Sequence, residues 1–260
     1  MELGLKDKVA VITGGSRGIG NAIARRMAGE GCKVCITGTN EQTMNEAVDK
    51  MKSEGAEIHG NVTDVTDSDS MREYVQKITD KLGGIDIWVN NAGICLYGPI
   101  ADMAEDDWDR VVNVNMKSVF LCTKYVSCIM KEKNKGVIIN AASFASVIPS
   151  ANSGVYAATK AAVLSMTKTL AAELAPWNIR VNAYIPGVIA TDMTQKAIYQ
   201  DTDFMLKTIA QQRFGTVEDV AGAVVFLSSD AAAYITGTSL EISGGKFCVQ
   251  NADFPWTNIK

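Results

Sequence analysis

Tyr156 and Lys160 stand four residues apart in the stretch Y-A-A-T-K. On a helix, two side chains at this spacing project from the same face, one turn apart. At roughly 4 to 5 Å, an ammonium group stabilises a phenolate by about 3 kcal/mol, which would lower the tyrosine's pKa by about two units from its ordinary value of ~10. Such a pair suits proton transfer near neutral pH. A buried tyrosine beside a lysine that keeps its charged end in water gives the same pattern, so the rest of the chain must decide.

A glycine-rich turn, G-G-S-R-G-I-G, follows the β-branched run Lys8–Thr13 directly. The run predicts a strand, and apolar residues at three- and four-residue spacing after the turn predict a helix. Strand, glycine turn and helix are typical of the start of a dinucleotide-binding fold, where the helix N-terminus binds phosphate. Gly14, Gly18 and Gly20 give G-x-x-x-G-x-G instead of the usual G-x-G-x-x-G, so the position of the turn carries more weight than its spacing.

Strands and helices alternate along the rest of the chain. Further strands are expected at Lys33–Thr37, Glu57–Val62, Ile85–Asn90, Gly136–Ala141, Arg180–Ile185 and Ser239–Ile242. Helices are expected at Glu41–Glu54, Ser68–Leu82, Glu105–Lys131 and Ser153–Ala175, with two more before the last strand. This alternation predicts an α/β fold of the Rossmann type, a doubly wound parallel sheet with helices on both faces, in a single domain covering residues 1–260.

The composition is that of a globular protein with a substantial core: 260 residues, 47% hydrophobic, 21% charged, with a net charge of −4. No Lys/Arg tract offers a nucleic-acid contact surface, and no apolar run approaches the ~20 residues needed to cross a membrane. The N-terminus lacks the layout of a signal peptide, and the six cysteines are expected to be core thiols in a reducing, cytoplasmic setting. His59 is the only histidine, which argues against a His-based triad and against a metal site.

The helix expected over Ser153–Ala175 has charged residues only at Lys160, Lys168 and Glu173. A helix that is apolar nearly all round is buried on more than one side. Because the sheet can cover only one face, we expect the other face to meet a second copy of the chain. The expected assembly is a homo-oligomer, with a tetramer favoured.

Ser143 stands thirteen residues before Tyr156, at the end of the apolar run G-V-I-I-N-A-A-S. With the other motifs, it makes the chain resemble the short-chain dehydrogenase/reductase family along nearly its whole length. The matching residues are T-G-G-S-R-G-I-G (13–20), Asp64 with Val65, N-N-A-G (90–93), Asn115, Ser143, Y-A-A-T-K (156–160) and P-G-V-I-A-T (186–191). Within the family, the likeness is to 3-oxoacyl-thioester reductases and to polyol and hydroxysteroid dehydrogenases.

The resemblance implies roles for four residues. Tyr156 would be the general acid for ketone reduction and the general base for alcohol oxidation. Ser143 would hydrogen-bond the carbonyl and stabilise the developing alkoxide. Lys160 would lower the tyrosine's pKa and hold the nicotinamide ribose hydroxyls, and Asn115 would position a water that feeds protons to Lys160. Because the cofactor delivers the hydride, the protein needs no covalent nucleophile.

The resemblance also implies a set of cofactor contacts. The pyrophosphate would lie at Gly14, Ser16, Ile19 and Gly20, the adenine at Asp64 and Val65, the adenosine ribose at Asn91 and Gly93, and the carboxamide at Val188 and Thr191, with Pro186 also in contact. Asp64 has a second reading, as the N-cap of a helix in V-T-D-V-T-D.

The stretch C-I-T-G-T-N after the second strand bears on the choice between NAD(H) and NADP(H). An NAD-preferring relative would carry an acid near Gly38 or Thr39 to bond the ribose hydroxyls, and neither position has one. Gly38 leaves room for a phosphate, Thr39 and Asn40 offer neutral donors, and Arg17 supplies one positive charge. We therefore expect NADP(H), although the arginine usual at position 39 is missing and Arg17 also occurs in NAD-dependent relatives.

The segment Ile189–Gly215 is expected to be a substrate lid, although an amphipathic helix facing the core would show the same mixture of apolar and charged residues. Its apolar content suits a substrate with a hydrophobic body better than a small sugar. An acidic carrier protein is a doubtful partner. Basic residues are present at Lys131, Lys133 and Lys135, but the second place where carrier-dependent relatives tend to be basic is Pro176–Trp177 here.

We expect an enzyme that interconverts a secondary alcohol and a ketone, both small molecules, with NADP(H), in the manner of a 3-oxoacyl-thioester reductase. The alternative within the family is an NAD(H)-dependent hydroxysteroid, bile-acid or polyol dehydrogenase. Alternatives of another class are a non-catalytic nucleotide sensor and a structural oligomer on the same fold. A sensor would be expected to lose at least one of Ser143, Tyr156 and Lys160, and all three are present.

A tail, residues 246–260, continues beyond S-G-G and carries Phe247, Phe254 and Trp256. Chain ends are often frayed, but three aromatic side chains gain much from burial. We expect Phe254 and Trp256 to pack near the substrate cleft or at a subunit interface, in their own subunit or in a neighbour.

Overall fold

The strands of the described residues, 3–258, form one parallel sheet in the computed structural model. They are β1 (Val9–Ile12), β2 (Lys33–Gly38), β3 (Ile58–Val62), β4 (Ile87–Asn90), β5 (Gly136–Ala141), β6 (Ile179–Pro186) and β7 (Ser239–Ile242), in the order β3-β2-β1-β4-β5-β6-β7. The central strands are fully buried and rich in Val and Ile, because helices cover both faces of a parallel sheet. The predicted fold class is confirmed.

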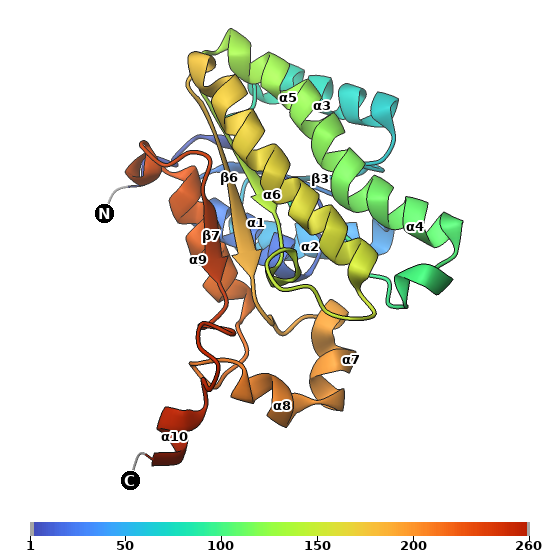
Figure 1. Ribbon diagram of the computed structural model, residues 1–260. Helices are drawn as coiled ribbons and strands as arrows, with labels where there is room; N and C mark the ends of the chain where they lie inside the picture. Colours follow the sequence, from blue (N-terminus) through green and yellow to red (C-terminus); the bar gives the residue numbers. More distant parts are fainter. Residues whose placement is uncertain (1–2, 259–260) are drawn as a thin grey trace.

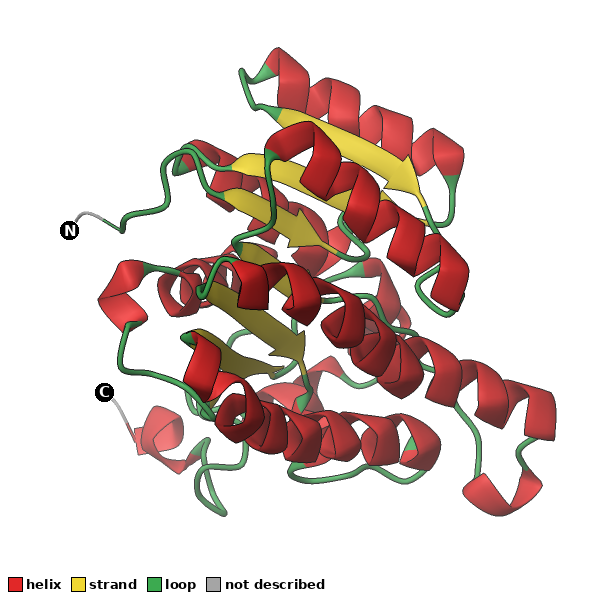
Figure 2. Ribbon diagram, turned by 90° about the horizontal axis from the view of Figure 1, so that it is seen from above, coloured by secondary structure: helices red, strands yellow, loops and turns green. Residues whose placement is uncertain are grey.

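Helices cover the sheet on both sides (Figures 1 and 2). The core on one face includes residues of α1 (Gly18–Gly29), α2 (Glu41–Ser53) and α9 (Val217–Ser228). The core on the other includes residues of α3 (Ser68–Leu82), α5 (Ser118–Glu132) and α6 (Gly154–Leu174). The remaining α-helices of the described chain are α4 (Glu105–Val112), α7 (Asp192–Gln200), α8 (Thr202–Lys207) and α10 (Phe254–Asn258).

The strand order reverses between β1 and β4, which both lie in the middle of the sheet. Val11 of β1 pairs with Cys35 of β2 on one side and with Trp88 of β4 on the other. In open α/β sheets, ligands bind beyond the carboxyl ends of the strands at such a switch point. The glycine turn after β1 and the N-N-A-G stretch after β4 therefore meet where the fold places a ligand.

The helix predicted over Glu105–Lys131 is instead two α-helices joined by a π-helical turn, Asn113–Lys117. A π turn inserts one extra residue into a helix and is frequent at functional sites. Asn115 lies in this turn and is fully buried. The predicted helical span is confirmed, whereas the π turn was not predicted, because a sequence pattern at helical spacing does not register a single inserted residue.

The region before the last strand differs from prediction as well. Three α-helices, α7, α8 and α9, stand between β6 and β7 instead of two. The first two belong to the predicted lid, whose ends Ile189 and Gly215 form a parallel bridge. Among residues 3–258, no helix is long and apolar enough to span a membrane.

Candidate active site

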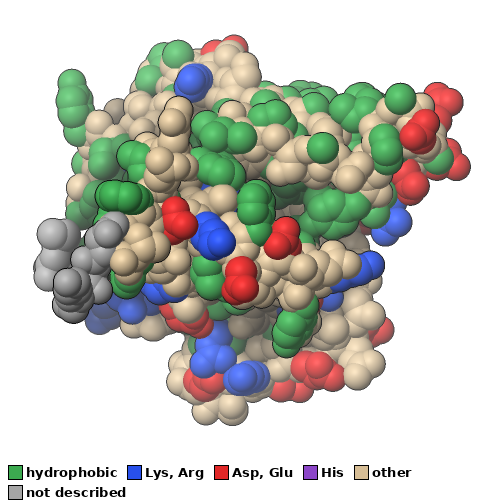
Figure 3. All heavy atoms as spheres, turned by 60° about the horizontal axis from the view of Figure 1, so that its bottom comes forward, with side chains coloured by type: hydrophobic (Ala, Val, Ile, Leu, Met, Phe, Trp, Pro, Cys, Tyr) green, Lys and Arg blue, Asp and Glu red, His purple; other side chains and the backbone are tan. Residues whose placement is uncertain are grey.

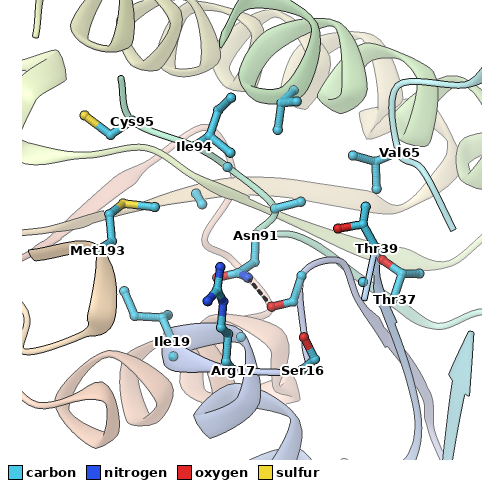
Figure 4. A pocket seen from close by; sticks show the side chains of 18 of the residues that line it. Ser16, Arg17, Ile19, Thr37, Thr39, Val65, Asn91, Ile94, Cys95 and Met193 are labelled. Atoms are coloured by element: carbon cyan, nitrogen blue, oxygen red, sulfur yellow. Dashed lines mark hydrogen bonds between the residues drawn. The ribbon is translucent and has the colours of Figure 1, made fainter. Parts of the chain in front are cut away.

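A cavity of about 890 Å³ opens at the switch point. Figure 4 shows Ser16, Arg17 and Ile19 on its glycine-turn side, Thr37, Thr39 and Val65 on a second side, and Ile94, Cys95 and Met193 opposite. The predicted cofactor residues that line it are Gly14, Ser16, Arg17, Ile19, Gly20, Thr39, Asp64, Val65, Asn91, Gly93, Tyr156, Lys160, Pro186 and Thr191. Val188, predicted with them, instead lines a separate hollow of about 400 Å³, together with Ile189 and Gly215.

The glycine turn is shaped for a phosphate. Gly14 has φ +64°, a conformation that glycine adopts without strain. A Cβ at Gly20 would lie 2.3 Å from the Gly14 carbonyl oxygen and 2.4 Å from the Asn91 amide nitrogen, so the turn closes only with glycine there. In the first turn of α1, which is fully described, no side chain caps the helix and no acid is present. Its N–H groups are therefore open to a pyrophosphate, and these residues fit a dinucleotide.

Asp64 and Val65 line the cavity beyond β3. The Asp64 carboxylate accepts hydrogen bonds from the backbone N–H and the hydroxyl of Thr66, both at 2.8 Å. The cap of α3 is Asp67, whose carboxylate accepts from the Ser70 N–H at 2.6 Å. The alternative reading of Asp64 as a helix N-cap is therefore wrong, since Asp67, the second aspartate of V-T-D-V-T-D, is the N-cap.

The structure brings the four predicted catalytic residues together. Tyr156 and Lys160 lie on the first two turns of α6 and line the cavity, and Ser143, after β5, hydrogen-bonds the phenol. The Lys160 ammonium donates to the Ala141 carbonyl at 2.8 Å. Asn115 exchanges hydrogen bonds with the Ile94 backbone at 2.8 and 2.9 Å. A Cβ on Gly93 would lie 3.3 Å from Asn115 Oδ1 and 3.4 Å from Lys160 Nζ, so these two side chains flank Gly93.

Burial controls the pKa values of the central pair. It raises the pKa of Tyr156 to about 12, and the hydrogen bond with Ser143 offsets this only in part. It lowers the pKa of Lys160 to about 8. The net direction for Tyr156 is thus opposite to the lowering predicted from the four-residue spacing. The Lys160 ammonium lies 5.8 Å from the Tyr156 ring centroid and is directed at Ala141, and loss of hydration outweighs its charge.

Lys160→Met should remove a pH dependence of stability. Because folding lowers this lysine's pKa from 10.5 to about 8, the unfolded chain binds more protons between those values, and the lysine makes the free energy of unfolding rise over that window. The free energy of unfolding of the methionine variant should exceed that of wild type most below pH 8, and the difference should shrink towards pH 10.5. Urea unfolding at several pH values measures it. Lys168→Met, at an exposed site on the same helix, is the control, and an advantage that does not change with pH would contradict the burial account.

Several residues that line the cavity were not predicted as catalytic or cofactor-binding from the sequence: Cys95, Arg110, Tyr184, Asp192 and Met193. Asp192 and Met193 directly follow the matched Thr191, and Cys95 lies two residues after N-N-A-G, so adjacency to a motif was the available signal. Tyr184 lies inside a buried strand and Arg110 on a helix, and nothing local in the sequence marks either. The Asp192 carboxylate pairs with Arg17 at 3.8 Å, which links the first residue of α7 to the glycine turn.

Backbone hydrogen bonds join the two ends of the lid, and the lid exposes apolar side chains. Ala190 donates to Gly215 and Gly215 to Val188, both at 2.9 Å. Ile209 is buried, whereas Tyr199 is 78% and Phe204 61% exposed. A helix that only faced the core would bury such residues, so the burial pattern favours the lid reading.

Known proteins match the chain along nearly its whole length. The family model described as enoyl-(acyl carrier protein) reductase matches residues 14–246. The chain is 40% identical over 241 residues to 3-oxoacyl-[acyl-carrier-protein] reductase FabG of Thermotoga maritima, covering 93% of this chain and 98% of that protein. The protein of the same name from Vibrio cholerae is 38% identical over 247 residues, covering 95% and 100%. The crystal structure of gox2181 has a TM-score of 0.93 and 32% identity, and the match covers 95% of this chain and 98% of that one.

The parallel sheet with its switch-point cavity and the matched relatives together define a nicotinamide-dependent oxidoreductase acting on CH–OH groups and ketones. The chain belongs to the short-chain dehydrogenase/reductase family. The predicted family and enzyme class are confirmed.

Proposed function

We propose that this enzyme reduces 3-oxoacyl thioesters to 3-hydroxyacyl thioesters with NADPH. The observation that carries the proposal is the group of Ser143, Tyr156 and buried Lys160 at a cavity that also takes in the glycine turn. The relatives named 3-oxoacyl-[acyl-carrier-protein] reductase support the substrate class, since the match to them covers more than nine-tenths of each chain.

The chain's own residues supply the proton chemistry. When bound, the reduced nicotinamide supplies a hydride to the carbonyl carbon. Tyr156 donates its phenolic proton to the carbonyl oxygen, and the Ser143 hydroxyl hydrogen-bonds that oxygen as negative charge develops on it. A phenol whose pKa is raised to about 12 by burial stays protonated through the neutral range and can therefore donate this proton. Lys160 would hold the ribose hydroxyls and keep a proton in reserve, and Asn115 would position the water that resupplies it.

We assign the cofactor preference to NADP(H). Gly38 and Thr39 line the cavity with Ser16 and Thr37 beside them, and none of these four carries a charge. Arg17 lines the neighbouring glycine-turn side of the cavity, where its side chain is 75% exposed although its guanidinium lies 3.8 Å from the Asp192 carboxylate. A cation with neutral donors, and no acid at position 38 or 39, favours the 2′-phosphate of NADP(H).

The surroundings of the cavity favour a substrate with a hydrophobic body. The face that carries the lid presents apolar side chains among scattered charges (Figure 3). Exposed apolar residues on the lid and on the loops after β4 and β5 are Met193, Tyr199, Phe204, Tyr97, Ile100, Val147 and Ile148. Apolar surface of this kind suits an acyl chain better than a sugar.

The lysines near the end of α5 make a weak docking patch for an acidic carrier. Lys131 lies over the Trp177 ring at 4.3 Å from its centroid. Lys133 pairs with Asp86 at 2.8 Å and Lys135 with Asp230 at 3.7 Å. Because each charge has a partner within the chain, we place substrate recognition in the apolar surroundings of the cavity and assign these lysines no carrier contact.

A turnover screen tests the proposed substrate. It compares 3-oxoacyl thioesters of coenzyme A and of acyl carrier protein with steroids, sugar acids and simple ketones, each with NADPH and NADH. The highest kcat/KM should fall on a 3-oxoacyl thioester with NADPH. A structure described as a candidate gluconate dehydrogenase, 30% identical with a TM-score of 0.92, supports the polyol alternative. Faster oxidation of a polyol or hydroxysteroid with NAD⁺ would establish that alternative instead.

We also propose a homotetramer whose interfaces involve α6 and the tail. The outer side of α6 exposes small residues, including Ala158, Ala161 and Ser165, which permit close helix packing. In the tail, Phe254 is 65% and Trp256 53% exposed in the single chain. Within the subunit, the Trp256 indole N–H donates to the Ala210 carbonyl at 2.9 Å, near the end of the lid. The exposed remainder of the two rings is available to a neighbouring subunit, the second place that the sequence left open. The last two residues of the predicted tail, 259 and 260, lie outside the described residues.

Deleting residues 251–260 should weaken assembly or change KM for the best substrate, because it removes the contact with Ala210 at the end of the lid and the exposed aromatic pair. Cofactor affinity should stay unchanged, since the tail as far as residue 258 lines no part of the main cavity. Light scattering and steady-state kinetics measure the two effects. An unchanged oligomer together with unchanged kinetics would refute a role for the tail.

A further inference from the structure

Tyr184 connects strands that are not neighbours in the sheet. It lies near the carboxyl end of β6, is 1% exposed, and contributes to the wall of the main cavity. Its hydroxyl donates to the side-chain oxygen of Asn91 at 2.9 Å. Asn91 follows β4, and β5 lies between β4 and β6. The side chains of Tyr184 and Asn91 therefore meet over β5, together bridging two strand spacings, roughly 10 Å.

The other end of the Asn91 amide holds the glycine turn. Its nitrogen donates to the Thr13 carbonyl at 2.9 Å and to the Gly14 carbonyl at 3.2 Å. This nitrogen also lies 2.4 Å from the point where a Cβ on Gly20 would stand, so it occupies the space that the glycine leaves. The two carbonyls can only accept and the Tyr184 hydroxyl donates, which fixes the amide in one orientation.

We propose that Tyr184 is a positioning residue of the cofactor site, whose hydroxyl holds the Asn91 amide and through it the glycine turn in the shape that binds a nicotinamide dinucleotide. The inference rests on the proposed function, which makes this cavity the cofactor site. It adds a contact from β6, the strand that leads into the lid, to the turn where phosphate is expected.

Burial alone does not give a tyrosine hydroxyl such a partner. Tyr74, also buried in a core against the sheet, has a hydroxyl without a hydrogen-bond partner among the described residues. Burial raises the pKa of Tyr184, so its phenol stays a neutral donor over the working pH range. The bond to Asn91 is thus a specific feature of the cavity wall.

Tyr184→Phe removes the hydroxyl and keeps the ring. One net hydrogen bond corresponds to about a three- to tenfold change in an equilibrium constant. Direct titration should show NADPH and NADH binding weakened by that factor to the same extent, with a smaller fall in kcat. Tyr74→Phe, which deletes an unpartnered buried hydroxyl, is the matched control and should leave both dissociation constants unchanged. A purely structural tyrosine would lower the melting temperature and leave cofactor affinity as it was.

A double-mutant cycle with Asn91→Ala isolates the proposed contact. In the Asn91→Ala background, Tyr184→Phe should have little further effect on cofactor affinity, because the partner is gone. Equal affinities of wild type and Tyr184→Phe, or a full effect of Tyr184→Phe without Asn91, would overturn the inference while leaving the proposed function intact. If the wild-type protein bound neither cofactor, the proposed function would fail and this inference with it.

Discussion

Tyr156→Phe should lower kcat by about 10²–10⁴, the range found when a general acid is removed. The phenylalanine ring fills the same buried site, so packing is kept and only the transferable proton is lost. The Ser143 hydroxyl remains, and any residual activity would come from its hydrogen bond to the carbonyl and from the orientation of the substrate. Steady-state and single-turnover reduction of the best ketone measure the loss.

Two controls accompany that variant. The dissociation constants for NADPH and NADH should change by no more than about tenfold, since one hydrogen bond at most is removed from the cofactor site. Tyr74→Phe, away from the cavity, should keep wild-type kcat. If Tyr156→Phe retains a tenth or more of kcat with chemistry rate-limiting, another group donates the proton and the assignment is wrong.

Gly38→Asp should reverse the cofactor preference, weakening NADPH by about 10²-fold or more and strengthening NADH. A carboxylate facing a 2′-phosphate costs several kcal/mol, whereas it accepts hydrogen bonds from the ribose hydroxyls of NADH. A Cβ at position 38 would lie 3.1 Å from both the Ser16 hydroxyl oxygen and the terminal methyl of Met44. The added side chain thus needs only a shift of flexible atoms.

Gly38→Asn is the matched control for Gly38→Asp, because it has nearly the same size without the charge. It should bind both cofactors within about tenfold of wild type. The larger part of the change in cofactor preference in Gly38→Asp would then come from the negative charge. Titrations with NADPH and NADH on all three proteins give the comparison. Tighter binding of NADH than of NADPH by the unmutated enzyme would reverse the assignment of NADP(H), and equal shifts in Asp and Asn variants would make the effect steric.

Local patterns in the sequence were sufficient for the sheet and the glycine turn, and the resemblance to the short-chain dehydrogenase/reductase family supplied most of the other cavity residues. The β-branched runs at Val9–Ile12 and Gly136–Ala141 predicted strands, and the glycine turn directly after the first of them predicted the start of a βαβ unit. Because parallel strands end at the same edge, motifs that follow strands converge without any long-range information. Gly14, Asn91 and Tyr156 accordingly line one cavity.

What the sequence did not predict depends on three-dimensional surroundings. The pKa of Tyr156 follows from how deeply α6 is buried, and the four-residue spacing to Lys160 carries no such information. In the sequence, Tyr184 looks like any other residue of a buried strand. Its contact with Asn91 depends on the strand order, which places β6 two strands from β4. Val188 lies only two residues after Pro186, yet it lines a different hollow.

The most direct test of the central claim is a single-turnover reaction of the NADPH-loaded enzyme with an excess of a 3-oxoacyl thioester. Nicotinamide absorbance and product analysis follow the two half-reactions at once. The proposed function predicts rapid oxidation of the bound NADPH, with one 3-hydroxyacyl thioester formed for each NADPH consumed. NADPH that stays reduced in the presence of the thioester, while a steroid or polyol exchanges hydride with the bound nicotinamide, would contradict it.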